Sequence, residues 1–176
     1  MDFSTHHVTQ SAEETQKIGE ALGSTYLKEK VSRSEIPLRG RSMGLPHIIL
    51  CTGDLGSGKT TFIRGIARGL GIDTRILSPT YIIVRRYSIP RLSPESFFYH
   101  LDLYRTKGLS DAEGVGIFEM LDDINSITVI EWPEMMGTVL LRPHIDCQFR
   151  VFEENKHEIT IQNKTTTNPR YGVDLL

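Results

Sequence analysis

Gly53-Asp54-Leu55-Gly56-Ser57-Gly58-Lys59-Thr60 is the stretch that decides the fold of this 176-residue chain. It matches the phosphate-binding pattern G-x-x-x-x-G-K-[ST] at every defined position. Such a match arises by chance in roughly one chain in a hundred of this length. The apolar segment His47–Thr52 precedes it, and the amphipathic segment Thr60–Leu70 follows. We therefore predict a phosphate-binding loop between a buried strand and a helix.

The chemistry of this loop predicts Mg²⁺-bound ATP as the ligand. Glycines allow successive backbone N–H groups to point into one hollow, and the helix that follows adds the positive end of its dipole. Lys59 is expected to reach the β- and γ-phosphates, the Thr60 hydroxyl to bind Mg²⁺, and Thr61 to reach the α-phosphate. The predicted nucleotide-binding residues are Gly53, Asp54, Leu55, Gly56, Ser57, Gly58, Lys59, Thr60 and Thr61.

Such a loop requires a second element, an acidic residue at the end of a neighbouring strand. Asp102 ends the apolar run Phe97–Leu101, and Glu131 ends the run Ile127–Ile130. Ligands collect at the carboxyl ends of strands in α/β sheets. Glu131 follows the cleaner run and is the favoured metal ligand, and it is counted among the candidate catalytic residues together with Lys59, Asp102 and Thr80. Two roles are predicted for Asp102: it either shares the metal shell or orients water.

Two further residues are candidates for the site. Thr80 follows Thr60 by 20 residues in a Ser-Pro-Thr sequence, which is typical of ordinary turns but also of mobile segments that cover a γ-phosphate. Trp132 is the only tryptophan and directly follows Glu131. It is expected either to pack in the core or to form an aromatic wall beside the nucleotide.

The rest of the chain predicts one α/β domain over residues 1–176. We expect a three-layer sandwich similar to P-loop NTPases, with a mixed sheet that is parallel at its centre and antiparallel at its edges. The segments that support this prediction are a helix over Ser11–Tyr26, an exposed inserted loop over Lys28–Gly44, strands over Tyr81–Tyr87, Phe97–Leu103 and Ser126–Glu131, a short acidic helix over Val115–Asp123, two antiparallel strands near 145–151 and 159–161, and a loose tail over 166–176.

The composition is that of a soluble globular protein, with 39% apolar and 24% charged residues. The formal net charge of −2 gives no overall positive field that would attract nucleic acid. The two cysteines are too far apart for a C-x-x-C pair, and no run is long enough to span a membrane. The first residues show no secretory signal, so a cytoplasmic location is expected.

Four motifs, in order, resemble the TsaE family, formerly called YjeE. They are GDLGSGKTTFIRGIARGLG (Gly53–Gly71), SPTY (Ser78–Tyr81), YHLDLYR (Tyr99–Arg105) and IEWPE (Ile130–Glu134). The resemblance covers roughly half of the chain directly. The combination of the four motifs is far more specific than the phosphate-binding pattern alone. The chain departs from the family pattern at Lys28–Gly44, which lengthens the link between the first helix and the strand before the phosphate-binding loop.

The resemblance implies a small Mg²⁺-dependent ATPase of tRNA threonylcarbamoyladenosine synthesis. Its partners would be the TsaB-like and TsaD-like proteins of a heterodimer, with tRNA reached only indirectly through that complex and no membrane involved. By this analogy Lys59 holds phosphate, Thr60 and Glu131 hold Mg²⁺, and Asp102 is needed for hydrolysis. Trp132 would lie near the site.

Two other functions stay open on the sequence: a free-standing P-loop kinase of a small molecule, and a nucleotide sensor that does not hydrolyse. A kinase needs an arginine-rich lid, and the arginines at 85, 86 and 91 fall within or beside a strand. A GTPase is disfavoured because Asn163–Thr166 lacks the Asp of the guanine-binding pattern. ATP turnover with and without the partner proteins separates these functions.

Overall fold

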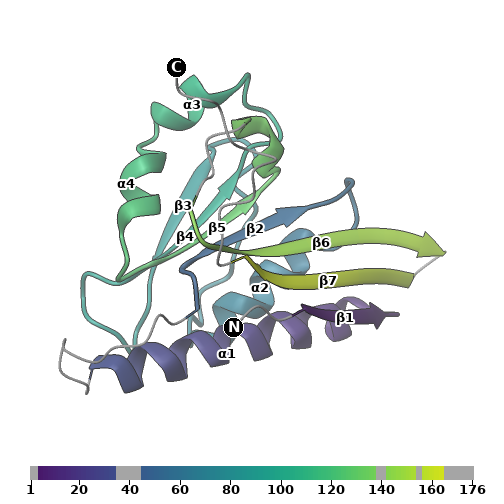
Figure 1. Cartoon of the computed structure of the whole chain (residues 1–176), viewed down its shortest axis with the longest axis horizontal. Coiled ribbons are helices and arrows are strands. Elements are labelled where there is room, and N and C mark those ends of the chain that lie inside the picture. Colours follow the sequence, from purple (N-terminus) through teal and green to yellow (C-terminus); the bar gives the residue numbers. More distant parts are fainter. Residues whose placement is uncertain (1–3, 35–44, 138–141, 154–155, 165–176) are drawn as a thin grey trace.

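The computed structural model of the chain describes residues 4–34, 45–137, 142–153 and 156–164 (Figure 1). Within these residues the strands and helices, in chain order, are β1 Ser4–Thr9, α1 Ala12–Ser34, β2 Ile48–Thr52, α2 Lys59–Gly69, β3 Val84–Ser88, β4 Phe97–Asp102, α3 Leu109–Glu113, α4 Ile117–Asp122, β5 Ile127–Glu131, the 3-10 helix η1 Pro133–Met136, β6 His144–Glu153 and β7 Lys156–Lys164.

The described strands form one mixed sheet in the order β1-β7-β6-β2-β5-β4-β3. The four inner strands β6, β2, β5 and β4 are parallel, while β1, β7 and β3 pair antiparallel with their neighbours. The predicted sheet, parallel at its centre and antiparallel at its edges, is confirmed. The two antiparallel strands expected near 145–151 and 159–161 are β6 and β7, and β6 also pairs parallel with β2 on its other side.

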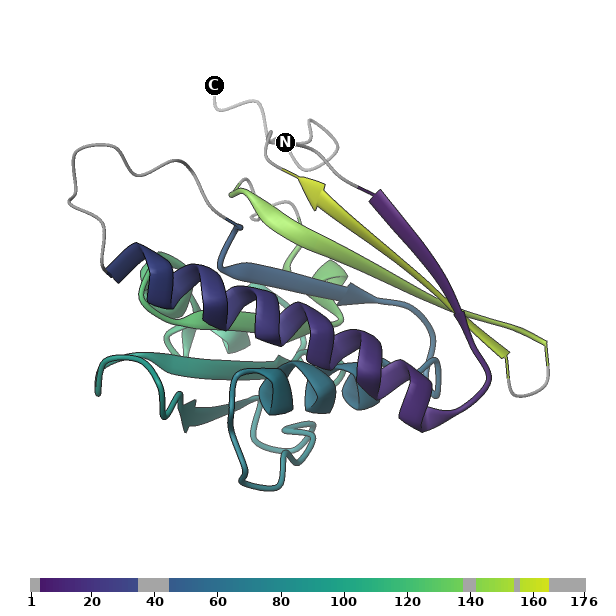
Figure 2. The same ribbon diagram turned by 90° about the horizontal axis from the view of Figure 1, so that it is seen from below.

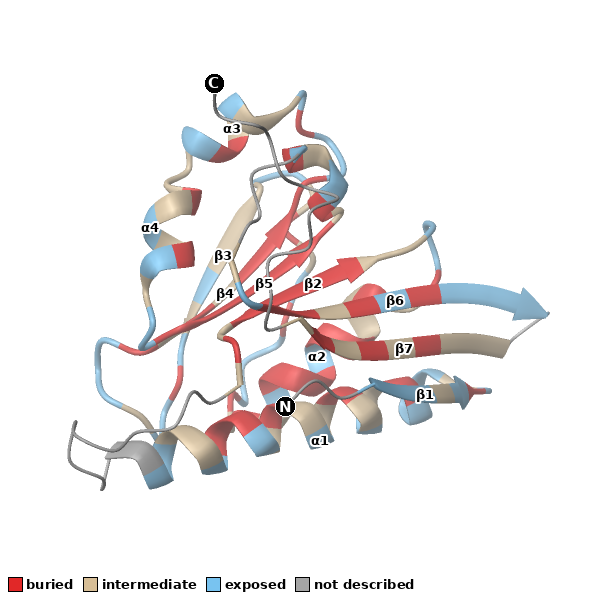
Figure 3. Ribbon diagram, viewed as in Figure 1, coloured by how far each residue is buried: buried red, intermediate tan, exposed pale blue. Residues whose placement is uncertain are grey.

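Helices cover both faces of the sheet, which confirms the three-layer arrangement. Figure 2, seen from below, shows α1 and α2 side by side in front of the sheet, and Figure 1 shows α3 and α4 on its opposite side. Because side chains alternate along a strand, β2 sends Ile49 and Cys51 toward α2, and Ile48 and Leu50 into a second core beneath α4. Figure 3 shows the buried residues concentrated in the central strands, whereas the outer end of β6 is exposed and the outer end of β7 is half-buried.

Four glycines set the contact between α1 and α2. A Cβ added at Gly19 or Gly23 of α1 would lie 2.1 or 2.2 Å from a backbone oxygen of α2. A Cβ at Gly65 or Gly69 of α2 would lie equally close, at 2.1 or 2.2 Å, to an oxygen of α1. Glycine weakens a helix by roughly 1 kcal/mol. This close packing explains why two glycines are kept inside the helix that begins at the phosphate-binding loop.

We expect Gly65→Ala to lower the free energy of unfolding by about 3 kcal/mol, because the new methyl group would force two helix backbones apart. The measurement is a urea unfolding curve. Gly114→Ala is the control, since that glycine has φ −59° and its added Cβ would lie 3.5 Å from its nearest neighbours. If both variants unfold at the same urea concentration, the helix contact is not as close as described.

The first helix is longer than predicted. It runs to Ser34 rather than Tyr26, so residues 28–34 are helical and not part of an exposed loop. Contacts with distant segments stabilise this extension: the Glu29 carboxylate accepts a hydrogen bond from the backbone of Leu45 at 2.9 Å, and Lys30 Nζ donates to Ile124 O at 2.6 Å. The rest of the predicted insertion, 35–44, and the predicted tail, 166–176, lie outside the described residues.

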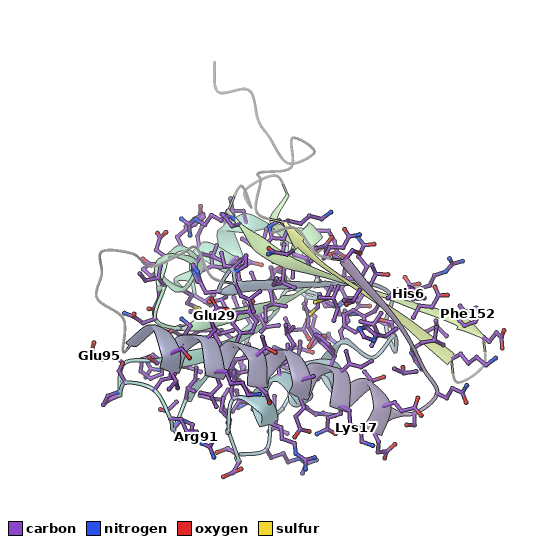
Figure 4. The ribbon with its side chains drawn as sticks, turned by 60° about the horizontal axis from the view of Figure 1, so that its bottom comes forward. His6, Lys17, Glu29, Arg91, Glu95 and Phe152 are labelled. Atoms are coloured by element: carbon purple, nitrogen blue, oxygen red, sulfur yellow. The ribbon has the colours of Figure 1, made fainter. Side chains whose placement is uncertain are left out.

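Other differences concern element boundaries. The predicted strand at Tyr81 begins only at Val84, because the backbone N–H groups of Ile82 and Ile83 both donate to Pro79 O and form a turn. The acidic helix is present as α4, while β1 and α3 were not predicted. β6 and β7 reach past the ends of the central strands (Figure 1), and Phe152 lies near the outer end of β6 (Figure 4). Among the described residues, no helix has the length and apolar character needed to cross a membrane.

Candidate nucleotide-binding site

The loop between β2 and α2 has the backbone that a phosphate-binding loop requires. Gly53, Gly56 and Gly58 have φ values of 136°, 78° and 101°, in the region that favours glycine. A Cβ at Gly53 would also lie 2.3 Å from Phe149 O on β6. The loop therefore depends on glycine for its conformation and, at its first residue, for the close approach of β6.

Lys59 lies inside this loop. Its Nζ donates hydrogen bonds to Gly53 O at 2.6 Å and to Asp54 O at 2.8 Å, and it lies 4.2 Å from the centre of the Trp132 ring. Burial lowers the pKa of the Lys59 ammonium from its ordinary value, while the nearby Glu131 carboxylate acts in the opposite direction. The ammonium is thus placed at the centre of the loop, where phosphate oxygens would meet it.

Thr60 and Glu131 are brought together from two different elements. The Thr60 hydroxyl, in the first turn of α2, donates to both oxygens of Glu131, at 2.9 and 3.1 Å. Glu131 ends the fully buried strand β5 and is itself only 3% exposed. It is the register neighbour of Cys51 on β2 and of Asp102 on β4, so the parallel strands deliver these residues to one edge of the sheet.

The donor set fits a magnesium ion that also binds phosphate. A hydroxyl and a carboxylate are hard oxygen ligands, and Mg²⁺ in nucleotide sites commonly uses one or two of them together with phosphate oxygens and water. Within the described part of the chain, no group of three or more His, Cys, Asp or Glu residues is arranged to hold a metal ion. The protein side chains alone do not form a full cage, which is the usual arrangement for Mg²⁺ beside a nucleotide.

The Asp102 carboxylate accepts hydrogen bonds from the segment that contains Thr80. Its Oδ2 accepts hydrogen bonds from Ser78 Oγ, at 3.0 Å, and from Thr80 Oγ1, and its Oδ1 accepts one from the backbone of Tyr104 at 3.1 Å. Asp102 therefore lies beside Glu131 in the sheet but bonds to a different partner. The structure brings Thr80 and Asp102 together and leaves their predicted roles as predictions.

Two non-glycine residues in the described chain have positive φ, and both adjoin these carboxylates. Trp132, with φ 59°, directly follows Glu131, and Ile83, with φ 65°, accepts the backbone hydrogen bond of Asp102 at 3.0 Å. Such conformations cost on the order of 1–3 kcal/mol each and are concentrated at functional sites. A β-branched residue such as Ile83 is especially unusual there.

Three residues that the sequence analysis gave no role also contact the site. His100 Nε2 lies 2.8 Å from Glu131 Oε1, and His157 Nδ1 lies 3.1 Å from Ser57 O of the loop. The methyl group of Thr15 lies 3.5 Å from where a Cβ of Gly58 would be. His100 could have been found from the sequence, since it precedes Asp102 by two residues and so shares its face of β4. Thr61 follows Thr60 on α2 and is half-buried.

Two apolar side chains on segments of the site are exposed to solvent. Leu55 of the loop is 63% exposed, and Tyr81, at the end of the Thr80 segment, is 84% exposed. Tyr104 packs against Trp132 with ring centres 5.0 Å apart, and Arg105 lies 4.7 Å above the Tyr81 ring.

Comparisons with known proteins identify the family that the chain matches. The family described as threonylcarbamoyl adenosine biosynthesis protein TsaE matches residues 9–164. The tRNA threonylcarbamoyladenosine biosynthesis protein TsaE of Borreliella burgdorferi is 47% identical over 93 residues, which is 53% of this chain and 64% of that protein. The protein of the same name from Rickettsia typhi is 30% identical over 141 residues, 80% of this chain and 94% of that protein.

One solved structure supports the fold. The crystal structure of Bacillus subtilis YdiB covers 97% of this chain and 90% of its own, with a TM-score of 0.65 and 24% sequence identity. At that identity the likeness concerns the arrangement of helices and strands alone. It supports the α/β fold with its mixed sheet.

Proposed function

The chain belongs to the TsaE family of threonylcarbamoyl adenosine biosynthesis proteins, and from this we propose that it is a cytoplasmic Mg²⁺-dependent ATPase serving tRNA threonylcarbamoyladenosine modification. The observation that carries the proposal is the contact of Thr60 with Glu131, next to a loop whose centre holds Lys59. These are the groups that an ATP–Mg²⁺ complex requires, held in one place by two parallel strands and one helix.

Each group has a part in this function. Lys59 and the N–H groups of the loop hold the phosphates, while Thr60 and Glu131 hold the metal. Mg²⁺, when bound, neutralises charge on the β- and γ-phosphates as the terminal bond breaks. Asp102 either shares the metal shell or orients the attacking water, and its bonds to Ser78 and Thr80 connect that part of the site to a segment that can report the γ-phosphate.

The protein partners that we propose are a TsaB-like and a TsaD-like protein, which act as a pair. The family membership supports this, together with two exposed apolar side chains, Leu55 of the loop and Tyr81 next to Thr80. A partner that covers these side chains would contact the protein where its nucleotide is hydrolysed. The formal charge of −2 supports contact with tRNA through the complex rather than directly.

ATP turnover with and without the TsaB–TsaD pair tests this function against its two alternatives. The proposal expects slow hydrolysis that increases when the pair is added. Phosphorylation of a small molecule without any partner would indicate a kinase. Binding of ATP with no turnover in either condition would indicate a sensor.

Trp132 gives a direct optical test of the site. It is the only tryptophan of the chain, and the Lys59 ammonium lies 4.2 Å from its ring centre. Phosphates that attract this ammonium would change the surroundings of the indole, so its emission should shift or change intensity when ATP and Mg²⁺ are added. Emission that stays constant at saturating ATP would place Trp132 away from the nucleotide and contradict its assignment.

A further inference from the structure

His100 is fully buried in the middle of β4, and one of its ring nitrogens contacts Glu131. Its exposed fraction is 0%, and Nε2 lies 2.8 Å from Glu131 Oε1. On the sheet it is the register partner of Val129, two pairs before Asp102 and Glu131. Burying an imidazole costs free energy because its polar nitrogens lose their contacts with water, whereas an apolar side chain could fill the same space without this cost. Packing alone therefore does not explain a histidine at this position.

The direction of this hydrogen bond follows from its partners. A carboxylate oxygen accepts, so Nε2 is the nitrogen that carries the proton. The other ring nitrogen, Nδ1, is buried and has no hydrogen-bond partner in the part of the chain that the structure describes. Glu131 therefore receives two donors from different elements, the Thr60 hydroxyl from α2 and the His100 ring from β4.

Glu131 has a competing partner nearby. The Lys59 ammonium is close enough for the Glu131 charge to raise its pKa, and a flexible glutamate would pair with it readily. No Lys59–Glu131 ion pair occurs within 4.0 Å in the described residues; Lys59 instead bonds to Gly53 O and Asp54 O. The hydrogen bond from His100 favours the orientation in which the Glu131 carboxylate contacts Thr60. The Lys59 ammonium then stays free to bind phosphate.

We propose that His100 is a positioning residue, which holds the Glu131 carboxylate against Thr60 and away from Lys59. It acts through Glu131 and touches neither nucleotide nor metal. This inference rests on the proposed function. Residues that orient a metal ligand in this way typically change metal affinity or activity 10- to 100-fold when they are replaced.

Two variants and one control test it. His100→Leu removes the donor, whereas His100→Gln can place an amide N–H near the position of Nε2. Val129→Ala, next to His100 on the neighbouring strand and equally buried, weakens the same core without touching Glu131. The readouts are the Mg²⁺ concentration that gives half-maximal ATP binding in calorimetry, ATP affinity in EDTA, and the unfolding midpoint.

The expected result separates positioning from packing. His100→Leu should raise the half-maximal Mg²⁺ concentration about tenfold or more, His100→Gln should recover most of the loss, and Val129→Ala should leave it unchanged although its unfolding midpoint falls. Equal Mg²⁺ dependence in wild type and His100→Leu would overturn the inference alone. Absence of Mg²⁺-dependent ATP binding in the wild type would overturn it together with the proposed function.

Discussion

Replacing Lys59 with alanine is expected to lower the affinity for ATP by about a hundredfold or more. The variant removes an ammonium that lies inside the loop, within 2.6 and 2.8 Å of two loop carbonyl oxygens. Hydrogen bonds between charged groups contribute about 1.5–3 kcal/mol each, and about 1.4 kcal/mol corresponds to a tenfold change in affinity. Two such bonds to phosphate account for the expected loss. Calorimetric titration of ATP with Mg²⁺ measures it.

Lys17→Ala is the matched control. Lys17 is an exposed lysine of α1, labelled in Figure 4, so its removal changes the net charge by the same amount. Its affinity for ATP should equal that of the wild type within about twofold, since exposed charges contribute little. An ATP affinity that is the same in Lys59→Ala and Lys17→Ala would show that the loop does not hold phosphate through this lysine.

Glu131→Gln is expected to reduce Mg²⁺-dependent ATP hydrolysis by about a hundredfold or more, because the variant loses the charge that faces the metal. Glutamine keeps the volume of the buried side chain and an oxygen that can accept from Thr60 and His100. The fold should therefore be retained. In EDTA the variant should bind ATP at least as well as the wild type, since a carboxylate beside the phosphates has been neutralised.

This pair of opposite effects distinguishes a metal ligand from a structural residue. If Glu131 had only a structural role, its replacement would lower both Mg²⁺-dependent hydrolysis and ATP binding in EDTA, because the protein would lose stability. Glu113→Gln, an exposed acid of α3, controls for the change in charge and should behave as the wild type. Hydrolysis by Glu131→Gln at the wild-type rate, with an unchanged requirement for Mg²⁺, would contradict the metal assignment.

The parts of the fold that the sequence predicted are those with a strong local pattern. The strand before Gly53 is a continuous apolar run, and the helix after Lys59 has its apolar residues on one face. Both elements appear as expected. The positions of Glu131 and Asp102 at strand ends also followed from the apolar runs that precede them. Because parallel strands end at the same edge of a sheet, the two acids were expected to lie near each other.

What the sequence did not predict depends on contacts between distant segments. β1 has the polar sequence STHHVT and becomes a strand only because it pairs with β7 near the other end of the chain. The last turns of α1 depend on bonds from Glu29 and Lys30 to residues beyond the helix. His100 has no distinctive spacing to a partner, since its hydrogen bond to Glu131 joins two neighbouring strands.

The most direct test of the nucleotide site is a calorimetric titration of ATP into the full-length, folded chain with Mg²⁺ present. The structure predicts saturable heat with one ATP bound per chain, weaker binding in EDTA, and no comparable heat with Lys59→Ala. If the wild type, shown to be folded by its cooperative unfolding, releases or absorbs no heat with ATP and Mg²⁺, the loop at Gly53–Thr60 is not a nucleotide site.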